Sequence, residues 1–93
     1  HLEGAAGIAG LIKAVLVLQH QAAPPNLHFS KLNPAMDVEG FPVVFPTTGG
    51  LTPLEGPAAY GGVSSFGFGG ANAHVLLERG SGLTNNVKAP VLY

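Results

Sequence analysis

The chain has 93 residues, of which 46% are hydrophobic and only 10% are charged, and its formal net charge at pH 7 is −1. A domain of this length buries only about 60 to 65% of its unfolded surface, and the usual charged share is about 25%. We therefore expect much of the chain to pack against polypeptide outside it. The four Lys and Arg residues exclude a basic surface for nucleic acid or a membrane. The absence of cysteine excludes disulfides, thiolate metal sites and a cysteine nucleophile within this chain.

The stretch from Leu2 to Gln21 predicts one helix of about five turns, because it is rich in good helix formers and contains no proline. Its apolar residues lie on nearly every face, which is typical of a buried helix, with Lys13 and the end from Gln19 to Gln21 reaching solvent. The two apolar runs on either side of Lys13 are too short for a membrane span. Glycine is unfavourable inside a helix, so we expect close approach of another backbone at Gly4, Gly7 and Gly10.

The middle of the chain is rich in proline. Ala22 to Pro34 predicts an ordered connector, which we expect His28 and Phe29 to pin to the core. Phe41 to Pro46 is β-branched and aromatic and is bounded by prolines, which predicts an edge strand or a strand end. Thr47 to Ala59 is predicted to be a loop, because glycine, proline and threonine dominate it.

Two strand-like runs near the end of the chain, 62–66 and 72–77, flank the sequence Gly67-Phe68-Gly69-Gly70 and predict a hairpin with a glycine turn. An apolar side chain such as Phe68 is not normally left in water at a turn, which suggests a site. The alternative, in which the ring only covers the end of a core, stays open. A dinucleotide loop would need a third glycine where Asn72 stands, and the Lys-Ser/Thr ending of a P-loop is missing.

Other catalytic and metal-binding patterns are missing from the sequence. The four histidines lack metal-ligand spacing and cysteine partners, so we expect no metal site. No Gly-x-Ser-x-Gly pattern surrounds Ser64 or Ser65, which we therefore interpret as strand residues. After Glu78, the composition predicts a linker or tail over residues 80–93.

Three motifs in order resemble the β-ketoacyl synthase (ketosynthase) domain, most closely that of type I polyketide synthases, with animal fatty acid synthase close behind. They are HLEGAAG from His1, PNLHF from Pro25 and GVSSFGFGGANAHV from Gly62. The resemblance covers residues 1–79 as the C-terminal part of such a domain. The chain opens on His1 inside the first motif, so we expect it to be excised from a longer sequence. The implied fold class is α/β, a fragment of the thiolase-like α-β-α-β-α layered fold, with the helix 2–21 sandwiched between two sheets.

The resemblance also implies the chemistry, which is decarboxylative Claisen condensation of an acyl thioester with a malonyl-type extender in polyketide or fatty acid elongation. His1 matches the histidine that donates a hydrogen bond to the thioester oxygen of the extender. Phe68 matches the residue whose N–H completes an oxyanion hole and whose ring closes the acyl pocket. Gly67, Gly69 and Gly70 match the neighbouring substrate-binding positions and would give the Phe68 backbone the conformational freedom that it needs. The nucleophilic cysteine, the other histidine and a lysine of the family are missing here. Asn72 and His74 match positions that we interpret as bracing the loop.

By the same resemblance, no cofactor is bound directly, and the substrates are carried on the phosphopantetheine of an acyl carrier protein. The expected partners are that carrier, the rest of the ketosynthase domain and a second copy in a homodimer, in the cytoplasm, without nucleic acid or a membrane span. We expect the chain to be inactive alone. Two alternatives remain: a non-catalytic condensing-domain relative that binds or gates acyl chains, and an unrelated small α/β binding domain.

Overall fold

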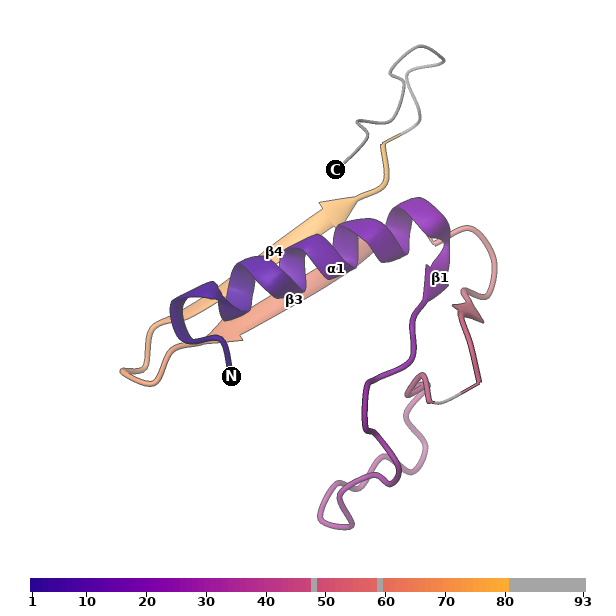
Figure 1. Cartoon of the computed structure of the whole chain (residues 1–93), viewed down its shortest axis with the longest axis horizontal. Coiled ribbons are helices and arrows are strands. Elements are labelled where there is room, and N and C mark those ends of the chain that lie inside the picture. Colours follow the sequence, from indigo (N-terminus) through magenta and orange to yellow (C-terminus); the bar gives the residue numbers. More distant parts are fainter. Residues whose placement is uncertain (48, 59, 81–93) are drawn as a thin grey trace.

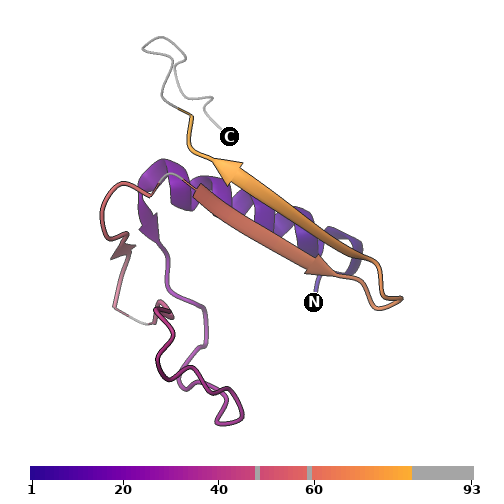
Figure 2. The same ribbon diagram turned by 180° about the vertical axis from the view of Figure 1, so that it is seen from behind.

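A computed structural model describes residues 1–47, 49–58 and 60–80, which form one helix packed along a hairpin, with a long loop to one side (Figures 1 and 2). The class is therefore α/β, as predicted. The elements are the 3-10 helix η1 (Glu3–Ala5), the helix α1 (Ala6–His20) and the strands β1 (Ala22–Ala23), β2 (Thr52–Pro53), β3 (Tyr60–Phe66) and β4 (Asn72–Glu78).

The predicted helix is confirmed, although its first turn is 3-10 rather than α. The helix ends at His20, because the left-handed backbone of the next residue, Gln21 (φ 53°), cannot continue it. The Gln21 side chain donates hydrogen bonds to the carbonyl oxygens of Leu18 (2.7 Å) and Ala58 (2.9 Å), and Leu54 N–H donates to the Gln21 carbonyl (3.0 Å). These bonds fix the loop before β3 to the end of the helix.

The predicted hairpin is also confirmed. β3 and β4 pair antiparallel, from Tyr60 opposite Glu78 to Phe66 opposite Asn72. Because side chains alternate along a strand, every second residue faces the helix. On β3 these are the half-buried Gly61, Val63 and Ser65, and the register places Ala73, Val75 and Leu77 of β4 beside them.

Glycines let the helix approach β3 closely. A Cβ atom at Gly7 would lie 3.2 Å from Ser65 Oγ, and one at Gly10 would lie 3.2 Å from Val63 Cγ1. The helix is therefore close to β3 at both positions, but the nearest atoms belong to side chains and not, as expected, to another backbone. At Gly4 a Cβ atom would meet nothing within 4 Å among the described residues, so the close approach stays a prediction there.

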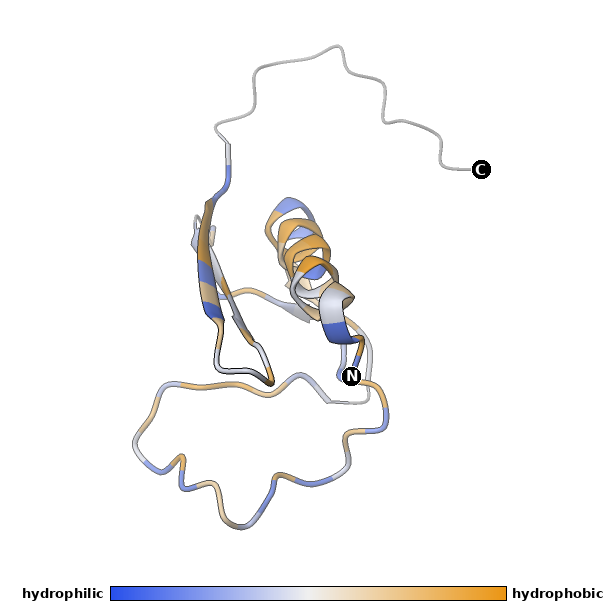
Figure 3. Cartoon of the chain, turned by 90° about the vertical axis from the view of Figure 1, so that its left-hand side faces the viewer, coloured by the Kyte–Doolittle hydropathy of each residue, from blue (hydrophilic) through white to orange (hydrophobic). Residues whose placement is uncertain are grey.

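The hairpin covers only one side of the helix (Figure 3). Among the described residues Leu18 alone is a buried hydrophobic residue, while Ile8 and Ile12 are more than half exposed, at 53% and 55%. Lys13 is exposed, as predicted. The burial expected for this helix is not reached within the described chain, and the side that the resemblance assigns to a second sheet is uncovered.

The edge strand predicted for Phe41 to Pro46 is wrong, because that segment forms no strand. Pro42 and Pro46 have no N–H for a ladder, and Val43 N–H donates locally to the Phe41 carbonyl (2.8 Å). Instead, β1 pairs antiparallel with β2, inside the predicted connector and the predicted loop.

The connector is held against this proline-rich segment rather than against the helix. Asn26 N–H and Asn26 Nδ2 both donate to the Pro46 carbonyl (2.9 and 3.2 Å), and the Phe29 ring stacks on Phe45 with centroids 6.0 Å apart. His28 is exposed with φ 59°, so the prediction that it pins the connector is wrong.

In the part of the chain that the structure describes, no helix combines the length and the apolar character needed to cross a membrane. The predicted tail lies outside the described residues from position 81 onwards.

Candidate active site

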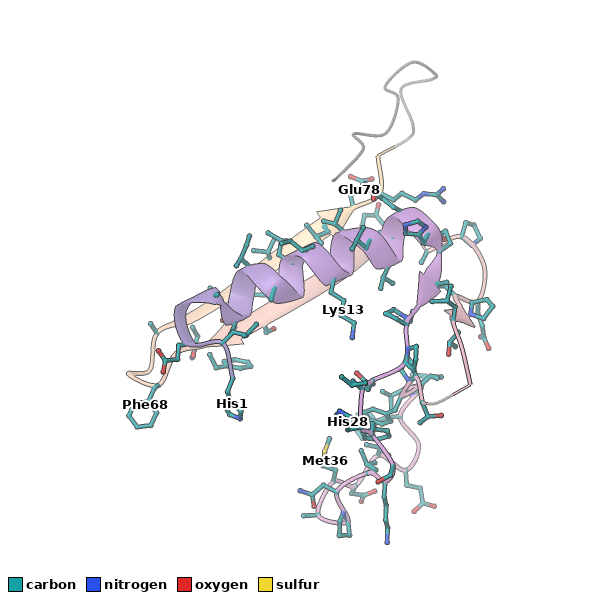
Figure 4. The ribbon with its side chains drawn as sticks, in the orientation of Figure 1. His1, Lys13, His28, Met36, Phe68 and Glu78 are labelled. Atoms are coloured by element: carbon teal, nitrogen blue, oxygen red, sulfur yellow. The ribbon has the colours of Figure 1, made fainter. Side chains whose placement is uncertain are left out.

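His1 and Phe68, which are far apart in the sequence, lie at the same end of the molecule (Figure 4). The packing of α1 on β3 explains this. Gly7 lies against Ser65 whereas Leu18 lies against Gly61, so the helix runs opposite to β3 and begins beside the hairpin turn. The two predicted catalytic residues are thus brought together by the direction of the helix.

A hollow of about 810 Å³ opens between the start of the helix and the turn. It is lined by His1, Leu2, Glu3, Gly4 and Ala6 from the first segment and by Phe66, Gly67 and Phe68 from the hairpin. Gly67 and Phe68 of the predicted substrate-binding turn therefore line it, whereas Gly69 and Gly70 do not.

The glycines of the turn have different roles. Gly67 N–H donates to the Ala71 carbonyl (2.6 Å), and a Cβ atom at Gly67 would lie only 2.9 Å from that oxygen. Gly70 N–H donates to the Gly67 carbonyl (3.0 Å), and Gly70 has φ 90°, which side-chain-bearing residues rarely adopt. Gly69 has neither constraint, so the expectation that all three glycines are needed for backbone freedom is wrong for Gly69.

The Phe68 N–H donates none of the backbone hydrogen bonds that close the turn, and its side chain is fully exposed. An N–H in this position is available to a negatively charged oxygen. The ring at the mouth of the hollow has no apolar cover from the described residues, which leaves it free to contact an apolar ligand.

The start of the helix adds to the electrostatics of the hollow. The 15-residue α1 directs the positive end of its dipole there, which favours negative charge that develops nearby. The Glu3 carboxylate, on a residue with φ 49°, lines the same hollow and opposes this field. His1 precedes this turn and contributes an exposed imidazole, which is able to donate a hydrogen bond.

The remaining predicted residues lie on the outer face of the hairpin. Ser64 Oγ and His74 Nδ1 share a hydrogen bond of 2.8 Å, which agrees with a bracing role for His74. Asn72 pairs with Phe66 at the last position before the turn. The sequence reasoning missed Phe66 and Glu3 as lining residues, although their spacing of two positions from Phe68 and His1 was visible. Among the described residues no three metal-binding side chains gather in one group.

Residues 1–30 match the family model described as the beta-ketoacyl synthase, C-terminal domain. A phenolphthiocerol/phthiocerol polyketide synthase of Mycobacterium tuberculosis is 55% identical over 84 residues, 89% of this chain and 5% of the relative. Hybrid PKS-NRPS synthetase iliA of Neonectria sp. is 52% identical over 81 residues, 84% of this chain and 2% of the relative. No solved structure matches the chain.

The chain thus spans 5% or less of the length of these relatives. The family model covers His1 and the first two motifs, which lie within residues 1–30. The match to the first relative extends over 89% of the chain, so it also takes in the third motif with Phe68. Together, the family model and the relatives identify the chain as the C-terminal part of a β-ketoacyl synthase domain, similar to those of polyketide synthases.

Proposed function

We propose that this chain supplies one side of the active site of a ketosynthase, which condenses an acyl thioester with a malonyl-type extender in polyketide or fatty acid elongation. The observation that carries the proposal is that His1 and Phe68 line one hollow although they lie far apart in the sequence. Residues 1–79 belong to this domain, and residues 80–93 are a linker or tail. The rest of the domain, with the nucleophilic cysteine, comes from polypeptide outside this chain.

In the first half of the reaction, the cysteine thiolate attacks the carbonyl carbon of an acyl thioester held on the phosphopantetheine of an acyl carrier protein. The new C–S bond places negative charge on the carbonyl oxygen. The N–H groups of Phe68 and of the cysteine donate to that oxygen, and the carrier thiolate then leaves. Stabilisation of this kind acts on the transition state more than on the substrate.

In the second half, the bond between the extender's α-carbon and its carboxylate breaks, carbon dioxide leaves, and the electron pair forms an enolate. His1 donates a hydrogen bond to the enolate oxygen as it gains charge. The enolate carbon attacks the acyl group on the cysteine, and the cysteine thiolate leaves. No proton has to move to His1 in this step, so a neutral imidazole with an N–H toward the extender is sufficient.

The surroundings of the hollow support these assignments. The ring of Phe68 and the lining residues Leu2 and Phe66 give it apolar walls for the acyl chain. The positive end of α1 favours both oxyanions. No cofactor other than the carried phosphopantetheine is required, and the intact enzyme is a cytoplasmic homodimer that receives its substrates from the carrier.

The test requires an intact domain, by which we mean a ketosynthase in which residues 1–79 replace the matching segment of the 55% identical relative. It is incubated with an acyl thioester and a malonyl-loaded carrier protein, and the β-ketoacyl product is measured by mass spectrometry. We expect product from the intact domain and none from the 93-residue chain, which has no thiol.

Two results would contradict this function. Product from the chain alone would show that the thiol is not needed. An intact domain that binds the acyl carrier but forms neither acyl-cysteine nor product would favour the non-catalytic relative, which binds or gates acyl chains.

A further inference from the structure

The outer face of the hairpin carries a polar pair close to the turn. Ser64 of β3 and His74 of β4 are directly opposite each other in the register, and their Oγ and Nδ1 atoms are 2.8 Å apart. Only two further residue pairs, Ser65 with Ala73 and Phe66 with Asn72, separate this bond from the turn. The pair is therefore the cross-strand side-chain bond nearest to Phe68 in the part of the chain that the structure describes.

The His74 ring occupies a defined place across β3. A Cβ atom at Gly62 would lie 3.2 Å from His74 Cε1 and 3.4 Å from Nε2, so the ring covers Gly62 while its Nδ1 reaches Ser64. The absence of a side chain at Gly62 makes room for the ring. Two contacts on one strand thus fix the orientation of a side chain from the other strand.

The hairpin depends on such contacts, because a two-stranded ribbon is marginally stable on its own and cross-strand pairs supply much of its stability. Register also decides where the turn points, since a shift of one residue moves every side chain to the opposite face. The turn begins at Gly67, and Phe68 is the next residue. A bond that holds Ser64 opposite His74 therefore also holds the Phe68 N–H in place.

We propose that His74 and Ser64 are positioning residues, which hold the Phe68 N–H at the oxyanion through their hydrogen bond across Gly62. This inference rests on the proposed function and assigns no contact with substrate to either residue. Its observable consequence is that the rate of acyl loading depends on the pair itself and not only on the stability of the fold.

The chain offers a matched control at the other end of the same ladder. Tyr60 Oη donates to Glu78 Oε1 at 3.4 Å, on the same outer face, and this pair lies four positions further from the turn. If the effect is local to the turn, Tyr60→Phe should leave acyl loading unchanged.

The experiment uses the intact domain and measures the rate of acyl-cysteine formation by mass spectrometry, together with the thermal midpoint of each variant. We expect Ser64→Ala and His74→Phe each to slow loading by about tenfold, as a small displacement of an oxyanion donor does. The double variant should be no slower than the slower single variant, because both changes remove one shared bond.

Conservative variants separate positioning from general support of the fold. His74→Asn places an amide near the position of Nδ1, and Ser64→Thr keeps the hydroxyl, so both should load at close to the normal rate. If His74→Phe does not fold, the comparison of Ser64→Ala with Ser64→Thr still decides the question.

Two outcomes would overturn the inference: normal loading in Ser64→Ala with only a lower thermal midpoint, or independent, additive effects of the two single changes. Failure of the proposed function would look different, because the unsubstituted intact domain would then form no condensation product. If that domain forms product and Ser64→Ala loads at the normal rate, only the positioning role is wrong.

Discussion

Gly70 and Gly69 are neighbours in the turn, but their backbone conformations differ. Gly70 has φ 90°, which strains any residue with a side chain, whereas Gly69 has no left-handed φ and open space around a Cβ position. Both follow Phe68, whose N–H we assign to the oxyanion, within two positions. The pair therefore separates the effect of turn geometry from the effect of any substitution nearby.

We expect Gly70→Val in the intact domain to misplace the Phe68 N–H and to slow acyl loading by about 10² to 10³, the usual cost of losing one oxyanion donor. Gly69→Ala is the control and should load at close to the normal rate. The rates are measured as acyl-cysteine formed per unit of folded protein. Equal rates for the two variants would remove turn geometry from the account.

For single residues, the sequence predicted which residue types form the site but not the backbone conformation of the turn. The motifs indicated His1 and Phe68, because a resemblance to a family depends only on residue identities and their spacing. Three glycines in four positions look alike in a sequence, because their φ angles follow from how the loop closes. Only the structure separates them: a Cβ atom at Gly67 would lie 2.9 Å from the Ala71 carbonyl oxygen, and Gly70 has φ 90°.

Among the elements, the contact between α1 and β3 determines where the site forms. Gly10 allows this contact, since a Cβ atom there would lie 3.2 Å from Val63 Cγ1. A Cβ atom at Gly4 would meet none of the described residues, so a substitution there does not disturb this contact. A change in the helix position would carry His1 away from the turn.

Gly10→Val adds three carbons to a filled contact, so we expect it to destabilise the intact domain by about 1 to 3 kcal/mol. Gly4→Ala should cause a smaller loss, because a Cβ atom there would meet none of the described residues and leaves the contact between α1 and β3 in place. The free energy of unfolding is measured by urea denaturation, and the thermal midpoint is compared alongside. A Gly10→Val domain as stable as the unsubstituted one would show that this close contact does not hold the helix.

Elements with strong local patterns were predicted well. The helix has an unbroken run of helix formers, and the hairpin has glycines between two β-prone runs. The segment 41–46 has β-prone residues too, but its prolines cannot donate to a ladder, and its outcome depended on contacts with Asn26 and Phe29. The short pair β1 and β2 has no periodic signal, because two residues are too few to show one.

The whole molecule has an apolar surface that its own elements do not cover. Leu18 alone is a buried hydrophobic residue in the described part of the chain, while Phe41, Val44 and Leu76 are each at least 71% exposed. Covering this much apolar surface would lower the free energy of the chain, because burial of apolar surface from water is favourable. Composition predicted this, because 46% hydrophobic residues exceed what so small a core takes up.

We therefore expect the isolated 93-residue chain to self-associate and to lack a cooperative unfolding transition. Sedimentation velocity measures the association state, and circular dichroism during heating measures cooperativity. The intact domain, in which we expect these surfaces to be covered, is the control. A monomeric chain with a single sharp transition would contradict this expectation.

The groups that carry out the proposed reaction come partly from this chain and partly from polypeptide outside it. His1 is assigned to decarboxylation and not to acyl loading. Acyl loading needs the thiolate and the oxyanion hole, neither of which His1 supplies. Decarboxylation needs a donor that faces the extender as it gains charge. His20 is an exposed histidine at the far end of α1 and provides the control.

The most direct measurement is therefore the separate assay of the two half-reactions in the His1→Ala intact domain, with His20→Ala beside it. Loading is followed by mass spectrometry of the protein, and decarboxylation by the release of carbon dioxide. We predict normal loading and a fall in decarboxylation of about 10² to 10³, which corresponds to losing one charge-stabilising donor. Lost loading with normal decarboxylation would contradict the account and place His1 with the nucleophile instead.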